Sequence, residues 1–226
     1  MRVAVTFFTY GGVEPETTDS LMAEFQMAME YKIQVLYTRV HGDALISRSR
    51  SKAMSSFLKQ TDTDVFFMLD HDLVWDHGAL LAICQEADKR KCIIGGMYSC
   101  RGKNAGFAGR LAKDGITIRI GADEMLDAEY VPGGFTAIPR LVVEEVFKHG
   151  TEIAKTAPES NAALSECIYM DGQPFWDFFR PIVIPSTIAP GKFEYLSEDW
   201  AIGWRARQAN PNRPQLLWSK PYLTHF

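Results

Sequence analysis

The chain has 226 residues, of which 46% are hydrophobic and 23% are charged, and its formal net charge is −4. These values are typical of a globular protein and exclude a disordered chain or a collagen-like repeat. The negative balance disfavours binding of nucleic acid through a broad basic surface, and no apolar run reaches the roughly 18 residues that a membrane span requires.

The first half of the chain alternates between strand patterns and helix patterns. Short apolar runs rich in β-branched and aromatic residues predict strands at 3–9, 33–39, 64–70 and 92–98. Apolar residues at helical spacing predict helices at 18–31, 44–58 and 80–88. The nearly continuous hydrophobicity of 64–70 is typical of a parallel strand that is covered on both faces. This alternation predicts an α/β protein with a parallel sheet.

The second half of the chain is less regular. The pattern predicts a hairpin over 107–120, a strand over 130–138 that two glycines interrupt, and helices over 140–148 and 197–208. Small and polar residues over 151–165 predict a mobile surface segment. No repeat and no clear linker divides the chain, so we expect one domain.

Two carboxylates, Asp70 and Asp72, directly follow the most hydrophobic predicted strand. Ligands of open α/β sheets bind beyond the carboxyl ends of the strands, and two carboxylates at i and i+2 can face one hard divalent cation. The same spacing occurs in Asp62 and Asp64, at the other end of that strand. Because short motifs recur by chance, position decides between them. We interpret Asp70 and Asp72 as metal ligands and the other pair as loop-capping residues.

Several other residues have both a structural and a functional interpretation. Glu198 and Asp199 begin a predicted helix, where acids are common in any case. His225 is either an exposed terminal residue or a third metal ligand. Arg48 and Arg50 lie either on a solvated helix face or against a phosphate or base.

The Gly133-Gly134 pair forms either a bulge or a point where the backbone approaches a ligand closely. Trp176 and Trp200 are candidates for stacking on a sugar ring or for packing in the core. The motifs of P-loop, Rossmann, serine-hydrolase and zincin enzymes are absent from the sequence. The four cysteines form no C-x-x-C pair, which favours reduced thiols in a cytoplasmic protein.

Taken in chain order, these segments resemble the GT-A fold of nucleotide-sugar-dependent glycosyltransferases, in the small form found in bacteria and phages. That fold is recognised by a D-x-D motif, a glycine loop, an x-E-D motif and a C-terminal histidine, in that order. The matching segments here are 9–10, 48–51, 70–72, 131–135, 197–200 and His225. The sequence segments at 94–98 and 134–140 also resemble segments of that family. Each motif is weak alone, but the joint order is a strong signal over most of the chain.

The resemblance implies a GT-A-like α/β sandwich, with a mostly parallel central sheet flanked by helices and a small second antiparallel sheet. It implies a single domain over 1–226, with a nucleotide-binding half at about 1–100 and an acceptor and catalytic half at about 101–226. Asp72 and His225 would bind Mn²⁺ or Mg²⁺, and Asp70 would contact the metal or the donor ribose. The metal would neutralise the charge that develops on the departing diphosphate.

The resemblance also implies a donor site. Thr9 and Tyr10 would line the nucleobase pocket, and Arg48 and Arg50 would lie near the base or the pyrophosphate.

The remaining roles concern the acceptor. Gly133 and Gly134 would let the backbone approach the sugar or the acceptor. Asp199 would be the general base in an inverting reaction, or would orient the acceptor or the sugar in a retaining one, and the sequence does not decide between the two.

We therefore expect a metal-dependent glycosyltransferase, with a UDP-sugar as the leading donor and an acceptor hydroxyl on a glycan or on a hydroxylated base of phage DNA. The alternatives are a metal-dependent phosphoesterase or nuclease that uses the same acids, and a non-catalytic domain that binds sugar nucleotides or glycans. We expect a cytoplasmic protein of a bacterium or of a phage-infected cell, without a membrane span.

Overall fold

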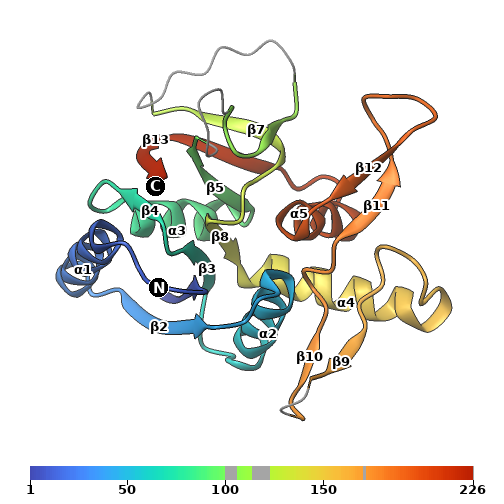
Figure 1. The fold of residues 1–226 in the computed structure, drawn as a ribbon, viewed down its shortest axis with the longest axis horizontal. Helices are drawn as coiled ribbons and strands as arrows, with labels where there is room; N and C mark the ends of the chain where they lie inside the picture. The colour runs from blue at the N-terminus through green and yellow to red at the C-terminus, as the bar shows by residue number, and fades with distance from the viewer. Residues whose placement is uncertain (100–105, 114–122, 170–171, 226) are drawn as a thin grey trace.

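The computed structural model describes residues 1–99, 106–113, 123–169 and 172–225, with the backbone alone for 220–225. Within these residues a large sheet contains β1 (Arg2–Thr9), β2 (Gln34–His41), β3 (Val65–Asp70), β4 (Leu73–Trp75), β5 (Ile93–Tyr98), β6 (Arg110–Leu111), β7 (Met125–Tyr130), β8 (Phe135–Pro139) and β13 (Gln215–His225). The strand order is β2-β1-β3-β8-β5-β13-β7-β6, and β4 pairs with β13 (Figure 1).

Most strands of this sheet run in one direction. The pairings orient β1, β2, β3, β5, β6 and β13 one way and β4, β7 and β8 the other. The predicted mostly parallel sheet is therefore confirmed, and its antiparallel member β8 lies between β3 and β5. The architecture is GT-A-like.

Helices cover both faces of the sheet. They are α1 (Pro15–Glu30), α2 (Ile46–Lys59), α3 (Ala79–Arg90), α4 (Arg140–Thr156) and α5 (Glu198–Ala209). One hydrophobic cluster joins α1 and α3 to the sheet, and a second joins α2, α4 and α5 to its other face (Figure 1). Along β3, Phe67 and Leu69 belong to the first cluster and Phe66 and Met68 to the second. Burial on both faces explains why this strand is almost entirely apolar.

Two small antiparallel ribbons lie outside the large sheet, where one small sheet was expected. One pairs β9 (Glu166–Ile168) with β10 (Pro174–Trp176), and the other pairs β11 (Ile182–Pro185) with β12 (Phe193–Leu196). Figure 1 shows both ribbons projecting from the body of the molecule.

The second half differs from its predicted elements in three places. The strand predicted over 130–138 is two strands, β7 and β8, which pair with different neighbours and are joined by residues 131–134. The helix predicted over 140–148 continues to Thr156. Only the end of the segment expected to be a mobile surface is packed: residues 162–164 are buried, and a Cβ at Gly150 would meet the side chain of Leu164. Local composition did not reveal these tertiary contacts.

The hairpin expected over 107–120 is only partly described. The turn expected at 113–115 falls mostly outside the described residues, because 114–122 are not described, and the described strand β6 pairs with β7. Cys84, Cys92 and Cys167 are free thiols. Within the described part of the chain, no helix combines the length and the apolar character that crossing a bilayer would take.

Candidate functional site

The carboxyl ends of β1 and β3 meet at one edge of the sheet. The register pairs Phe8 of β1 with Asp70 of β3. Beside these ends lies a pocket of about 330 Å³. Its lining is Phe8, Thr9, Tyr10, Val40, Asp43, Ala44, Ile46, Ser49, Arg50, Asp70, His71, Asp72 and Glu198. The ligand-binding edge predicted from the strand ends is therefore where the pocket lies.

Arg50 of α2 connects two segments that are distant in the sequence. Its Nη2 donates a 2.9 Å hydrogen bond to Asp70 Oδ1, and its Nη1 donates one of 2.9 Å to Glu198 Oε1. Only 3% of the Arg50 side chain is exposed. Arg50 thus holds the end of β3 against the start of α5, from the floor of the pocket.

The Gly133-Gly134 pair fits into this cluster at van der Waals distance. A Cβ on Gly133 would collide with the Arg50 guanidinium, and one on Gly134 would lie 2.6 Å from the Tyr98 hydroxyl and 2.8 Å from Asp70 Oδ2. The backbone is also tied here, because Gly134 N donates to the Tyr98 hydroxyl and Asp70 N donates to Gly134 O. The glycines are therefore required by close approach of the protein's own groups.

Asp199 begins α5 and is held by several donors. Its Oδ2 accepts a 3.1 Å hydrogen bond from Gly133 N. Its Oδ1 accepts from Trp200 N at 2.9 Å and from the Ser197 hydroxyl. The Ser197 hydroxyl thus orients the carboxylate of Asp199, and the glycine loop and the x-E-D segment are directly hydrogen-bonded.

The cluster has more acids than cations. Burial alone would lower the pKa of Arg50, but Asp70, Glu198 and Asp199 outweigh it and raise that pKa above its ordinary value. Burial raises the pKa of Glu198, although the charge of Arg50 opposes the change. Burial likewise raises the pKa of Tyr98, so its phenol stays protonated at neutral pH. Arg50 offsets only one of the neighbouring carboxylates.

These residues suit a divalent cation in charge and in donor type. Asp70 and the buried Asp72 line the same pocket, and carboxylate oxygens are the ligands that Mg²⁺ and Mn²⁺ prefer. The β13–β4 pairing sets His225 opposite Leu73, the residue after Asp72. Among the side chains that the structure describes, no group of three potential ligands is assembled, and the side chain of His225 lies outside them.

Of the residues predicted to form the donor site, Thr9, Tyr10 and Arg50 line the pocket and Arg48 does not. Thr9 is buried and its hydroxyl donates to Gly11 O at 2.9 Å, whereas Tyr10 is 67% exposed at the rim. Arg48 lies outside that lining and has partners of its own. Its guanidinium donates to both oxygens of Asp43 and lies 3.9 Å from the centre of the Tyr169 ring.

Some site residues were assigned no role from the sequence. In the sequence, Glu198 was noted only as the acidic residue beside Asp199. Nothing in the neighbouring residues predicts its hydrogen bond to Arg50. Tyr98 was visible only as the last residue of a predicted strand. Asp43 carried no motif, although it lines the pocket and its carboxylate pairs with Arg48.

The structure also shows the contacts of the two tryptophans and of Asp64. Trp200 stacks on Tyr130, with ring centroids 4.9 Å apart, and Trp176 meets Phe147 edge to face. Both tryptophans therefore pack against protein rings. Asp64 Oδ2 accepts a 2.7 Å hydrogen bond from the backbone of Arg2, as the loop-capping interpretation predicts.

The comparisons with known proteins support the fold. No family model and no curated protein matches the sequence. The crystal structure of A197 from STIV is 16% identical, covers 100% of this chain and 86% of its own, and has a TM-score of 0.58. That of S. aureus TarS 1-349 in complex with UDP-GlcNAc is 12% identical, covers 100% of this chain and 59% of its own, and has a TM-score of 0.46. At these identities the likeness to A197 shows a shared fold alone, and the chain spans only part of the TarS structure.

Proposed function

We propose that this chain is a metal-dependent glycosyltransferase that moves a sugar from a nucleotide-diphosphate sugar, with a UDP-sugar as the leading donor, to an acceptor hydroxyl. One observation supports this above all. Carboxylates from the end of β3 and from the start of α5 converge at one pocket, on a GT-A-like fold, with Arg50 between them. The acceptor hydroxyl belongs to a glycan or to a hydroxylated base of phage DNA.

The pocket supplies the donor site in this proposal. Thr9 and Tyr10 line the nucleobase end, and Asp70 contacts the ribose or the metal. Arg50 lines the same pocket but already donates to two carboxylates. We therefore assign its main contribution to holding those carboxylates, and Arg48 is left to meet the base or pyrophosphate at the rim.

The metal site would be formed by Asp70, Asp72 and His225. A bound Mn²⁺ or Mg²⁺ would supply Lewis-acid neutralisation of the charge on the diphosphate leaving group. Asp70 brings only part of its carboxylate to that task, because its Oδ1 accepts from Arg50.

Asp199 is the group that handles the acceptor proton. In an inverting reaction its carboxylate takes the proton from the acceptor hydroxyl, the acceptor oxygen bonds to the anomeric carbon, and the bond to the diphosphate breaks, releasing the nucleoside diphosphate. Gly133 N and the Ser197 hydroxyl hold that carboxylate in place. In a retaining reaction Asp199 orients the acceptor or the sugar instead.

In this proposal the two halves of the chain have different functions. Residues 1–100 bind the nucleotide, through the ends of β1 and β3 and the start of α2. Residues 101–226 supply the glycine loop, Asp199 and the acceptor side. The Arg50–Glu198 hydrogen bond links the two halves within a single GT-A-like domain.

The decisive experiment is thermal unfolding of the full chain with nucleoside diphosphates and nucleotide sugars, each with and without Mn²⁺. A ligand at 100 times its Kd adds about 2.7 kcal/mol to the free energy of unfolding, which in a chain of this size raises the Tm by roughly 5 to 10 °C. We expect one nucleotide series to give this rise, and a chelator and Asp72→Asn to remove it.

The matched control is Asp76→Asn, which changes an exposed aspartate on the following turn and should leave the rise intact. A folded protein whose Tm no nucleotide changes would contradict the proposal and favour a glycan-binding domain. Release of phosphate from simple phosphoesters, without transfer of a sugar, would favour the phosphoesterase alternative.

A further inference from the structure

The ribbon of β11 and β12 presents a surface apart from the pocket. The register pairs Val183 with Tyr195 and Pro185 with Phe193, so these four side chains share one face. The other face turns inward, where Ile182 and its partner Leu196 are buried. The ribbon projects from the body at the upper right of Figure 1. One of its faces therefore belongs to the core and the other faces solvent.

The outer face is apolar from the strands to the turn. The exposed fractions are 52% for Val183, 73% for Phe193 and 68% for Tyr195, and Ile188 in the turn is 71% exposed. Contiguous apolar surface costs free energy in water and marks a site of interaction. The name outer face refers below to these five residues: Val183, Pro185, Ile188, Phe193 and Tyr195.

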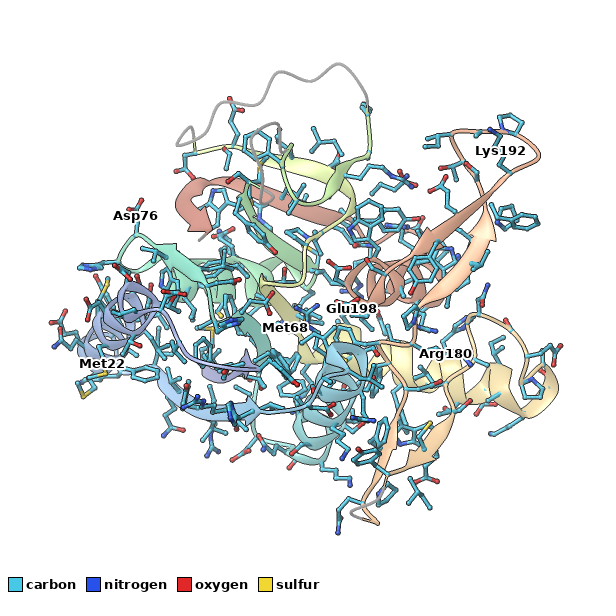
Figure 2. All side chains as sticks on the ribbon, in the orientation of Figure 1. Met22, Met68, Asp76, Arg180, Lys192 and Glu198 are labelled. Atoms are coloured by element: carbon cyan, nitrogen blue, oxygen red, sulfur yellow. The ribbon has the colours of Figure 1, made fainter. Side chains whose placement is uncertain are left out.

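Charge is almost absent from this surface. Residues 182–196, all described by the structure, include only two charged side chains, Lys192 and Glu194. Glu194 is directed inward: it accepts from the Ser186 hydroxyl at 2.7 Å and from Arg110 Nη1 at 2.8 Å. Lys192 is exposed at the end of the turn, where Figure 2 labels it at the tip of the ribbon. The outer face therefore presents hydrophobic side chains and one positive charge.

This face is smaller than a standard protein–protein interface. A standard protein–protein interface uses about 20 to 30 residues a side, and the outer face has five on a narrow projecting ribbon. Interfacial membrane binding needs less, because its strength follows the apolar area that is buried plus the attraction of basic residues to anionic lipid. Tyr195 also suits a boundary between apolar and wet surroundings.

We infer that the outer face docks on a lipid surface, with Ile188 and Phe193 entering the boundary between headgroups and acyl chains and Lys192 contacting lipid phosphate. Arg110 fixes the ribbon to β6 through Glu194, so the ribbon meets the surface as a rigid arm. Because β12 leads directly into α5, docking holds the candidate site near that surface. This inference does not depend on the proposed function.

The test is co-sedimentation of the full chain with vesicles of phosphatidylcholine, and of phosphatidylcholine with phosphatidylglycerol. We expect binding to both, and tighter binding to the anionic vesicles. Phe193→Ser combined with Ile188→Ser should weaken binding to both by at least about tenfold. Lys192→Glu should weaken binding to the anionic vesicles alone, by about fivefold.

The matched control is Ile168→Ser on β9, since that isoleucine is 74% exposed but lies on the other ribbon. It should bind as the wild type does, and unchanged Tm values would show that every variant is folded. Absence of sedimentation with both vesicles would overturn the inference, and so would an equal loss in the control. A concentration-dependent dimer that Phe193→Ser dissolves, without vesicle binding, would assign the surface to a second copy instead.

Discussion

Arg50 and Asp70 are joined by a 2.9 Å hydrogen bond between Nη2 and Oδ1, and the same guanidinium reaches Glu198 at the same distance. The contact with Glu198 spans 148 positions of sequence. A buried cation between carboxylates from β3 and α5 makes the geometry of the site depend on an internal ion cluster. Arg50 acts on the candidate site through the acids that it positions.

Replacing Arg50 should therefore destabilise the protein. Arg50→Met leaves two partly buried carboxylates without their cation, which costs about 3 to 5 kcal/mol in the free energy of unfolding. Urea denaturation measures the change. Lys89→Met is the control, because the exposed ion pair of Lys89 with Glu86 contributes about 1 kcal/mol or less. A loss for Arg50→Met no larger than the control's would refute the structural role of the cluster.

The glycine loop should not tolerate a side chain. In Gly134→Ala the new Cβ meets the Tyr98 hydroxyl and Asp70 Oδ2 at less than 3 Å, and overpacking of this kind costs about 1 to 3 kcal/mol. The displaced Asp70 should also weaken the nucleotide-dependent rise in Tm. Gly106→Ala, where a Cβ has open space, serves as the control in both measurements. Wild-type stability in Gly134→Ala would show that the loop has room to move.

Asp199 should be needed for turnover and not for binding of the donor. Loss of a general base lowers kcat about 10²- to 10⁴-fold, so Asp199→Asn should abolish most sugar transfer while the nucleotide still raises the Tm. The amide also places an NH₂ group against one of the donors that now bind the carboxylate. A quenched assay for released nucleoside diphosphate, with the exposed Asp127→Asn as control, checks this result. Unchanged kcat would remove Asp199 from the mechanism.

Glu24 should make stability depend on pH. It is 1% exposed on α1, and its Oε1 accepts from Trp75 Nε1 and from Leu80 N at the start of α3. Burial raises its pKa in the folded state above the ordinary value of 4.5. Folding therefore favours the protonated acid, and this stability is lost as the pH rises through the raised pKa.

The comparison with Glu24→Gln isolates this effect, because the amide keeps the accepting oxygen and does not ionise. From about pH 4.5 upward, urea unfolding should show the wild type losing free energy of unfolding relative to the variant. Glu16→Gln, an exposed site on the same helix, should run parallel to the wild type. A constant difference between wild type and Glu24→Gln at all pH values would contradict the assignment.

The sequence determined the alternation of strands and helices in the first half, and the places where carboxylates follow strands. These features are local, because the periodicity of apolar residues shows which face of an element is buried. The sequence of β3 is almost entirely apolar because both of its faces are buried. The ends of β1 and β3, with Thr9, Asp70 and Asp72, could therefore be placed at one edge of the sheet from the order of the residues alone.

Only the tertiary structure decided what Arg50 does and how the second half packs. Its bond to Glu198 and the fit of Gly134 against Tyr98 join residues far apart in the chain, and such contacts leave no periodic trace in either segment. Both faces of the β11–β12 ribbon are mostly apolar in sequence, and the one acidic residue, Glu194, lies on the inner face, so only packing shows which face is covered. Ion pairing and close approach depend on where the folded backbone brings side chains together, and local pattern does not encode that distance.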